Sequence, residues 1–217
     1  MKISKKDSPK FEIDPKSSAL LVIDMQNAFL SSGPFELPGG LKIVPGIKDL
    51  ILRCRQLGIL VAFTRVYHDD MDEGVYPNLF PDHFDKEGKP RLTRSSPIFQ
   101  IVSELAPTIN DLIIDKGRYS AFYQTELEAI LRKKGIGTLF IVGLATNVCC
   151  ESTARDAFFR NFRVIVLSDL NVTYSKEAHE ASLENIRNCF GFVVESSELR
   201  KMLPIVPMSQ SSRKKRS

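Results

Sequence analysis

The sequence predicts an α/β fold: one doubly wound, Rossmann-like domain with three layers, in which helices cover both faces of a six-stranded parallel sheet. Short apolar segments rich in branched residues are typical of strands buried on both faces, and here they alternate with amphipathic segments of about 10 to 15 residues. This alternation favours right-handed βαβ crossovers. The length of 217 residues fits one such domain. We place it at 15–205, between a frayed N-terminus at 1–14 and a disordered basic tail at 206–217.

The individual elements follow from local periodicity. The run "SALLVIDM" is short, apolar and branched, which indicates a buried strand, and the segment 46–58 places apolar residues at helical spacing before a terminal glycine. The same unit then recurs along the chain. The expected strands are 18–25, 59–64, 111–116, 137–145, 162–169 and 191–196, and the expected helices are 46–58, 125–135, 147–161 and 176–190.

One long segment does not follow this alternation. Residues 66–97 are polar and rich in proline, and loops of this length in compact domains usually serve a function. We expect a lid or an oligomer contact there, although no motif within the segment identifies its ligand.

Composition excludes several classes of protein. The net charge of +4 is supplied by "RKKR" at 213–216, so the remaining chain is about neutral and lacks the basic face of a nucleic-acid-binding domain. The longest apolar runs fall short of the roughly 18 residues that a membrane span needs. The N-terminal segment has no apolar core of a signal peptide, and four cysteines without CxxC spacing suggest reduced thiols. We therefore expect a cytoplasmic protein without nucleic-acid or membrane partners.

Three reactive side chains follow or end predicted strands. Asp24 ends the first strand, Lys116 ends the strand at 111–116, and Cys149 opens the helix after "FIVGLA". Ligands of open parallel sheets bind beyond the carboxyl ends of the strands, so these three are candidates for one site. Considered separately, Asp24 could equally be a helix cap or a surface carboxylate, and Lys116 a solvated charge.

Helical phase distinguishes the two adjacent cysteines. Cys150 falls on one stripe with Ala154, Ala157 and Phe158, which indicates packing against the sheet, whereas Cys149 lies about 100° round the helix. If Thr146 or Asn147 caps this helix, Cys149 lies in its first turn, where the helix dipole and a nearby lysine would lower the pKa of the thiol. A carboxylate within reach could exchange the thiol proton.

Three segments together resemble the isochorismatase-like cysteine hydrolases over roughly residues 15–200: "VIDMQNAF", "KGRYSAFYQTEL" and "VGLATNVCCESTARDAF". The resemblance implies a catalytic triad in which Asp24 shuttles the proton, Lys116 holds the thiolate and Cys149 is the nucleophile. It also implies a cis peptide at Leu144–Ala145 that aims the N–H groups of Ala145 and Cys149 at an oxyanion. The family's pattern of T-[N/D]-x-C-V has an apolar valine where this chain has Cys150, in agreement with the helical phase.

Within the family, the chain looks closest to the ureidoacrylate and biuret hydrolase branch. That branch implies three substrate-binding residues, namely Phe29, Gln100 and Tyr119. From its place at a strand end we add Arg65 as a partner for a substrate carboxylate, with a surface ion pair as the alternative. No cofactor is expected, and the family commonly forms homodimers or homotetramers.

The expected reaction is hydrolysis of a C–N bond in a small amide or ureido (carbamoyl) compound through a thioester, with release of ammonia. Nicotinamidases of the family hold a metal with an Asp-x-His pair, and Val66 stands here in place of that aspartate, so we expect no metal. The acidic "HDDMDE" remains a possible cation site, with a solvated loop face as its alternative. The open alternatives are an isochorismatase-type vinyl-ether hydrolase, a nicotinamidase-like amidase and a catalytically silent family member that acts as a binding module.

Overall fold

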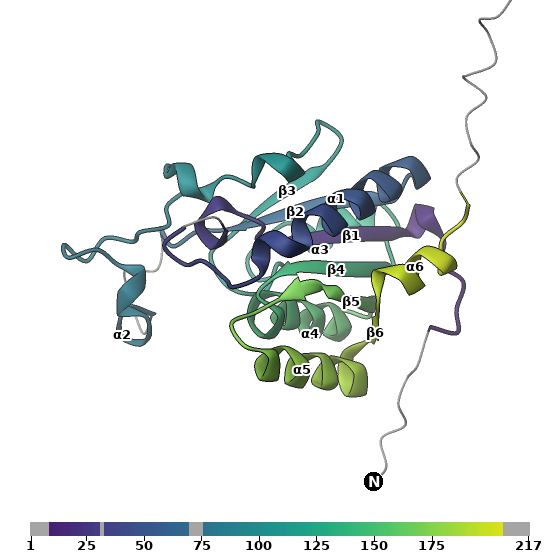
Figure 1. Ribbon diagram of the computed structural model, residues 1–217. Coiled ribbons are helices and arrows are strands. Elements are labelled where there is room, and N and C mark those ends of the chain that lie inside the picture. Colours follow the sequence, from purple (N-terminus) through teal and green to yellow (C-terminus); the bar gives the residue numbers. More distant parts are fainter. Residues whose placement is uncertain (1–8, 31–32, 70–75, 206–217) are drawn as a thin grey trace, which may run out of the picture.

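The computed structural model describes residues 9–30, 33–69 and 76–205, so the basic tail expected at 206–217 lies outside the described residues. All pairings in the six-stranded sheet are parallel, in the order β3-β2-β1-β4-β5-β6, which confirms the expected fold class (Figure 1). The strands are β1 (Ser18–Ile23), β2 (Leu60–Val66), β3 (Leu112–Lys116), β4 (Thr138–Leu144), β5 (Arg163–Val172) and β6 (Phe192–Val194). The α-helices are α1 (Gly40–Leu57), α2 (Tyr76–Leu79), α3 (Leu127–Lys133), α4 (Glu151–Phe159), α5 (Lys176–Asn185) and α6 (Ser196–Met202).

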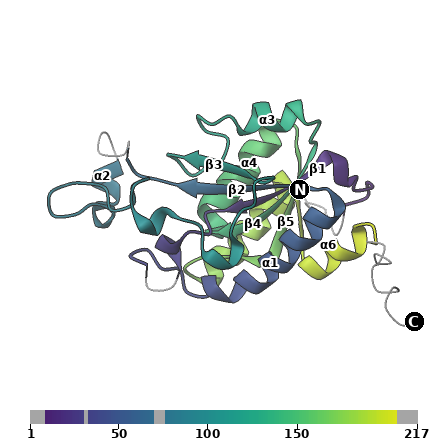
Figure 2. The ribbon, with the colours of Figure 1, turned by 90° about the horizontal axis from the view of Figure 1, so that it is seen from above.

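Helices cover both faces of the sheet. Figure 2 shows α1 and α6 on one side and α3 and α4 on the other, and α5 packs with the second group. Alternate residues of β1 enter the two cores: Leu20 and Val22 face α1, whereas Leu21 and Ile23 face the α3–α5 layer. Burial on both faces explains why this strand is continuously apolar.

Several boundaries differ from the sequence expectations. Helix α1 begins at Gly40 and contains Pro45, although proline usually ends a helix. The turns before Pro45 are nevertheless helical because Ile43 and Val44 bury their side chains in the core. Helix α6 was not predicted, and its central Leu199 is fully buried. Tertiary packing stabilises both segments despite their weak local signals.

Part of the expected frayed N-terminus packs on the sheet layers. The sequence predicts fraying over 1–14, but within the described residues 9–14 Ile13 is buried and Phe11 packs edge-on against Phe192. Burial of these two apolar side chains holds the chain in place before β1. Among the described helices, none is both long and apolar enough to cross a bilayer.

The strand order determines where a site can form. The chain runs outward from β1 through β2 to β3, and then returns to the other side of β1 to form β4. The order of strands therefore reverses between β1 and β4, which pair along their whole length. Crevices at such switch points, beyond the carboxyl ends of the strands, are where open α/β sheets bind ligands.

Candidate active site

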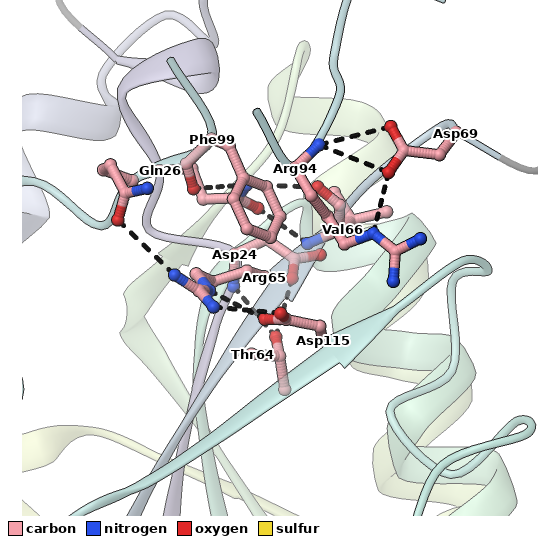
Figure 3. A network of polar contacts seen from close by, with 10 residues as sticks. Asp24, Gln26, Thr64, Arg65, Val66, Asp69, Arg94, Phe99 and Asp115 are labelled. Atoms are coloured by element: carbon pink, nitrogen blue, oxygen red, sulfur yellow. Dashed lines mark hydrogen bonds and ion pairs between the residues drawn. The ribbon is translucent and has the colours of Figure 1, made fainter. Parts of the chain in front are cut away.

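A buried ion pair joins Asp24 and Lys116. Lys116 Nζ donates to Asp24 Oδ2 at 2.7 Å, and both side chains are at most 2% exposed. The other carboxylate oxygen, Oδ1, accepts a hydrogen bond of 2.6 Å from the hydroxyl of Thr64. The carboxylate is therefore fixed in orientation by partners on two neighbouring strands, as Figure 3 shows for Thr64.

The lysine reaches Asp24 from two strands away. Lys116 ends β3, and β2 lies between β3 and β1, a separation of about 10 Å at ordinary strand spacing. A lysine side chain can bridge much of this distance. Its Nζ donates a second hydrogen bond, of 3.1 Å, to the carbonyl oxygen of Arg118. Burial alone would lower the pKa of Lys116, but its interactions with neighbouring groups, foremost the Asp24 carboxylate, outweigh that effect and raise the pKa. The ammonium group is thus retained inside the protein.

Asp24 adopts an unusual backbone conformation. Its φ of 49° lies in the left-handed region, which few non-glycine residues occupy, although aspartate tolerates it better than most. The Asp24 N–H donates to Thr64 Oγ1 at 3.1 Å, so one threonine holds both the main chain and the carboxylate. This geometry turns the chain sharply after β1 and leaves the carboxylate at the edge of the sheet.

Cys149 lies on a π-helical turn, Thr146–Cys150, which connects β4 to α4. The preceding peptide bond, Leu144–Ala145, is cis, as the sequence comparison with the family implied. Neither Thr146 nor Asn147 caps the turn, because Ala145 occupies the N-cap position and forms no side-chain cap. The turn is instead braced by α5, where His179 Nδ1 lies 2.8 Å from the Thr146 hydroxyl.

Gly143 allows β4 to approach β1 directly before this turn. Its φ is 121°, and an added Cβ would lie 2.1 Å from the carbonyl oxygen of Ile23. Only glycine fits at this position, since any side chain would collide with the backbone of β1. The approach brings the segments that carry Asp24 and Cys149 to the same edge of the sheet.

The electrostatics of Cys149 differ from the sequence expectation. Burial raises the pKa of the thiol, the nearby Lys116 ammonium lowers it, and the Asp24 carboxylate raises it again, so that the net direction is upward. The sequence had suggested a lowered pKa, but the thiol is only 8% exposed and desolvation outweighs the lysine. The raised pKa favours the neutral thiol, so a base is needed to remove its proton.

Cys150 packs in the core, as its helical phase predicts. It is fully buried together with Ala154 and Ala157 in the core between the sheet and the α3–α5 layer. Phe158, assigned to the same stripe, is instead 43% exposed and contacts Phe159 and Phe190. The predicted stripe is therefore correct only for its first three members.

A cavity of about 310 Å³ opens over Cys149 and Asp24. It includes two of the expected substrate-binding residues, Phe29 and Tyr119. Its other walls are apolar or aromatic, contributed by Leu37, Val66, His68, Tyr76, Phe80, His83, Leu144, Ala145, Val148 and Tyr174.

Two expected substrate-binding residues, Arg65 and Gln100, do not line this cavity within the described residues. Arg65 forms a bidentate ion pair with Asp115 at 2.7 and 2.9 Å and covers the ring of Phe99 (Figure 3). Gln100 lies beside it, with Oε1 3.4 Å from Arg65 Nη1. Side chains alternate along a strand, so Arg65 points away from the face used by Thr64. The alternative interpretation of Arg65, an ion pair, is therefore the correct one.

Sequence reasoning missed the residues that the 66–97 segment contributes to the cavity. Tyr76 and His83 are joined by a contact of 3.3 Å between the phenol oxygen and Nδ1, and the His83 ring stacks on His68 at 4.9 Å. His68 is 2% exposed, and its Nδ1 has no hydrogen-bond partner within the part of the chain that the structure describes. The length of the segment signalled a function, but no spacing in it identified these side chains.

The structure thus places the Asp24 carboxylate and the Cys149 thiol in the wall of one cavity at the switch point of a parallel sheet, with the Lys116 ammonium group paired to the carboxylate. Comparisons with known proteins show which family the chain resembles. The isochorismatase domain model matches residues 18–198. A ureidoacrylate amidohydrolase (RutB) from Caulobacter segnis is 35% identical over 206 residues, covering 87% of this chain and 86% of that protein. A protein named nicotinamidase 3 from Arabidopsis thaliana is 34% identical over 200 residues, covering 92% and 95%.

The solved structures include one of a cysteine hydrolase from Pseudomonas syringae that superimposes with a TM-score of 0.81. It is 30% identical and covers 90% of this chain, which in turn covers 97% of that structure. Sequence and fold thus agree over nearly the whole of the described residues, and the chain belongs to the isochorismatase family of hydrolases.

Proposed function

We propose that the protein is a cysteine-dependent amidohydrolase that cleaves a C–N bond of a small amide or ureido compound, through a thioester and with release of ammonia. One observation carries the proposal: the buried Asp24–Lys116 pair shares a cavity with the Cys149 thiol. The names of the amidohydrolase relatives support C–N bonds as the target.

Asp24 is the base that activates the nucleophile. We assign this role to Asp24 because its carboxylate lines the same cavity as the Cys149 thiol and raises the pKa of that thiol. Transfer of the proton to Asp24 produces a thiolate beside the Lys116 ammonium, which replaces one ion pair with another and leaves the net charge of the cavity unchanged.

The thiolate then adds to the carbonyl carbon, and the C=O electrons move to oxygen. We assign the N–H groups of Ala145 and Cys149 to this oxyanion, since the turn that carries both opens onto the cavity. Each such donor typically contributes about 3 kcal/mol to the transition state. As the tetrahedral intermediate collapses, the C–N bond breaks and Asp24 returns its proton to the leaving nitrogen, which departs as ammonia.

Hydrolysis of the thioester regenerates the enzyme. Asp24, again a carboxylate, takes a proton from a water molecule that attacks the acyl carbon, and the C–S bond breaks. Cys149 leaves as a thiolate and recovers the proton from Asp24. For an amide the product is a carboxylic acid, and for a ureido compound it is a carbamate.

The adjacent cysteines provide a matched test. Cys149→Ala should abolish ammonia release from a panel of ureidoacrylate, biuret, N-carbamoyl amino acids and nicotinamide, without changing the circular dichroism spectrum. Cys150→Ala, a fully buried neighbour, should retain turnover. An active Cys149→Ala or an inactive but folded Cys150→Ala would refute the assignment.

A nicotinamidase-like amidase is the second candidate, favoured by the Arabidopsis relative and by His68 in the cavity wall. Against it, Val66 offers no metal-binding oxygen, and the described residues contain no cluster of three or more histidine, cysteine, aspartate or glutamate side chains suited to a metal. Most of the acidic "HDDMDE" segment, 70–73, lies outside the described residues. Preferred turnover of nicotinamide in the panel would select this second candidate.

A further inference from the structure

Arg118 is held beside the proposed catalytic lysine. Its carbonyl oxygen accepts a hydrogen bond of 3.1 Å from Lys116 Nζ, and the next residue, Tyr119, lines the cavity. The backbone of Arg118 is therefore fixed relative to the proposed reaction centre, two residues beyond the buried ion pair.

The Arg118 side chain has no acidic partner. Its Nη1 donates to the carbonyl of Gly117 at 2.8 Å, and no carboxylate among the described residues lies within ion-pair distance. By contrast, Arg65 and Arg94 pair with Asp115 and Asp69. A guanidinium group has five N–H donors, so most of those on Arg118 remain free to bind a ligand.

The charge of Arg118 reaches three walls of the cavity. Burial is the main cause of the shifted pKa of His68, Tyr76 and Tyr119, and the positive charge of Arg118 lowers the pKa of all three. These side chains come from the segment after β3, from α2 and from the segment after β2, and all of them line the cavity. Arg118 is exposed to solvent and is not itself among the lining residues, so its charge acts on these walls from outside the cavity.

Among the described residues, the cavity interior offers an anion no other cation. Lys116 is already neutralised by Asp24, and burial lowers the pKa of both lining histidines, that of His68 to about 3 and that of His83 in the same direction. Apart from Asp24 and the Cys149 thiol, the other described lining residues are apolar or aromatic. A carboxylate at the deep end would be desolvated without a partner, at a high cost. At the outer edge of the cavity, a carboxylate would instead meet the guanidinium group of Arg118, which has no acidic partner among the described residues.

We propose that Arg118 binds a carboxylate on the end of the substrate opposite the scissile C–N bond. This inference rests on the proposed function and narrows it: the substrates are ureido or amide compounds that carry a carboxylate. The neutral ureido or amide group enters the aromatic cavity towards Cys149, and the anionic end stays at the mouth. Planar bidentate pairing with Arg118 fixes the orientation of the substrate.

Ureidoacrylate and its methyl ester form the matched probe pair, since they differ only in the carboxylate charge. Wild-type protein should turn over the acid with a KM about tenfold below that of the ester. Arg118→Gln should raise the KM of the acid about tenfold, with little change in kcat, and leave the ester within about twofold. Arg118→Lys keeps the charge but cannot pair bidentately, so its KM for the acid should lie between those of the wild type and Arg118→Gln.

Arg65→Gln is the control, because it removes the same charge from the same edge of the sheet at a side chain paired with Asp115. It should leave the ratio of the two KM values unchanged. A wild-type preference for the ester, or an equal loss for acid and ester in Arg118→Gln, would overturn the proposal.

A binding experiment separates this inference from the proposed chemistry. In the Cys149→Ala background, calorimetry should show tighter binding of ureidoacrylate than of its ester, and adding Arg118→Gln should remove the difference. Equal affinities, or no binding of either compound, would contradict a carboxylate site even if the enzyme hydrolyses other amides. If selective binding is found but wild-type protein releases no ammonia, the carboxylate site stands and the proposed hydrolysis fails.

Discussion

Lys116 Nζ and Asp24 Oδ2 lie 2.7 Å apart in the interior of the protein, although 92 residues separate them in the chain. Two charges removed from water cost several kcal/mol each unless they neutralise one another. Here they do, and in addition the Thr64 hydroxyl donates a hydrogen bond to Asp24 and the Arg118 carbonyl accepts one from Lys116. The pair is therefore tolerated in the fold and available for chemistry.

Breaking this pair should destabilise the protein. Lys116→Met leaves the Asp24 carboxylate buried without its cation, and we expect the free energy of unfolding in urea to fall by about 3 to 5 kcal/mol. The double variant Lys116→Met/Asp24→Asn removes both charges and should recover part of that loss, while remaining inactive. If the single and double variants have the same free energy of unfolding, the Asp24 and Lys116 charges do not stabilise one another.

The Cys149 thiol should be unreactive at neutral pH in the absence of substrate, because its burial raises the pKa. In a Cys189→Ser background, which removes the exposed cysteine, alkylation of Cys149 by iodoacetamide should accelerate about tenfold per pH unit between pH 6 and 9. Mass spectrometry of the Cys149 peptide measures the rate. A plateau below pH 7 would instead indicate the stabilised thiolate that the sequence alone suggested.

His68 should make the protein less stable in mild acid. Burial, then the charges of His83 and Lys116, lower its pKa from 6.5 to about 3, so the folded state favours the neutral ring. This contribution is complete above pH 6.5 and is lost as the pH falls from 6.5 towards 3. Between pH 6.5 and 5 the loss should reach up to about 2 kcal/mol.

Urea titrations of wild-type protein and His68→Phe at the two pH values test this effect. Phenylalanine keeps an aromatic ring in the wall but cannot take up a proton, so the variant should lose less stability on acidification. Parallel losses in both proteins would assign the acid sensitivity to other groups.

Gly143→Ala should prevent β4 from packing against β1. The added methyl group would meet the Ile23 carbonyl at 2.1 Å in a backbone conformation that disfavours side chains. We expect a loss of about 3 kcal/mol or more in the free energy of unfolding, together with loss of activity. Gly137→Ala, where the nearest atom is 3.5 Å away, is the matched control and should change stability by less than about 0.5 kcal/mol.

The sequence by itself determined the layers of the fold and the three reactive side chains. Continuous apolar runs such as β1 occur because a parallel sheet covered on both faces needs them, and the alternation with helices then specifies the topology. Asp24, Lys116 and Cys149 could be found because they stand at or directly beyond strand ends, which a parallel sheet gathers at one edge. Helical phase likewise separated Cys149 from Cys150.

Tertiary structure alone decided what surrounds these residues. Whether Arg65 is free depends on an acidic partner, Asp115, that is distant from it in sequence and adjacent only through strand register. The direction of the Cys149 pKa depends on how much water the cavity excludes, which periodicity does not encode. The aromatic wall from Tyr76 to His83 comes from an irregular segment, where no repeating pattern links residue spacing to position in space.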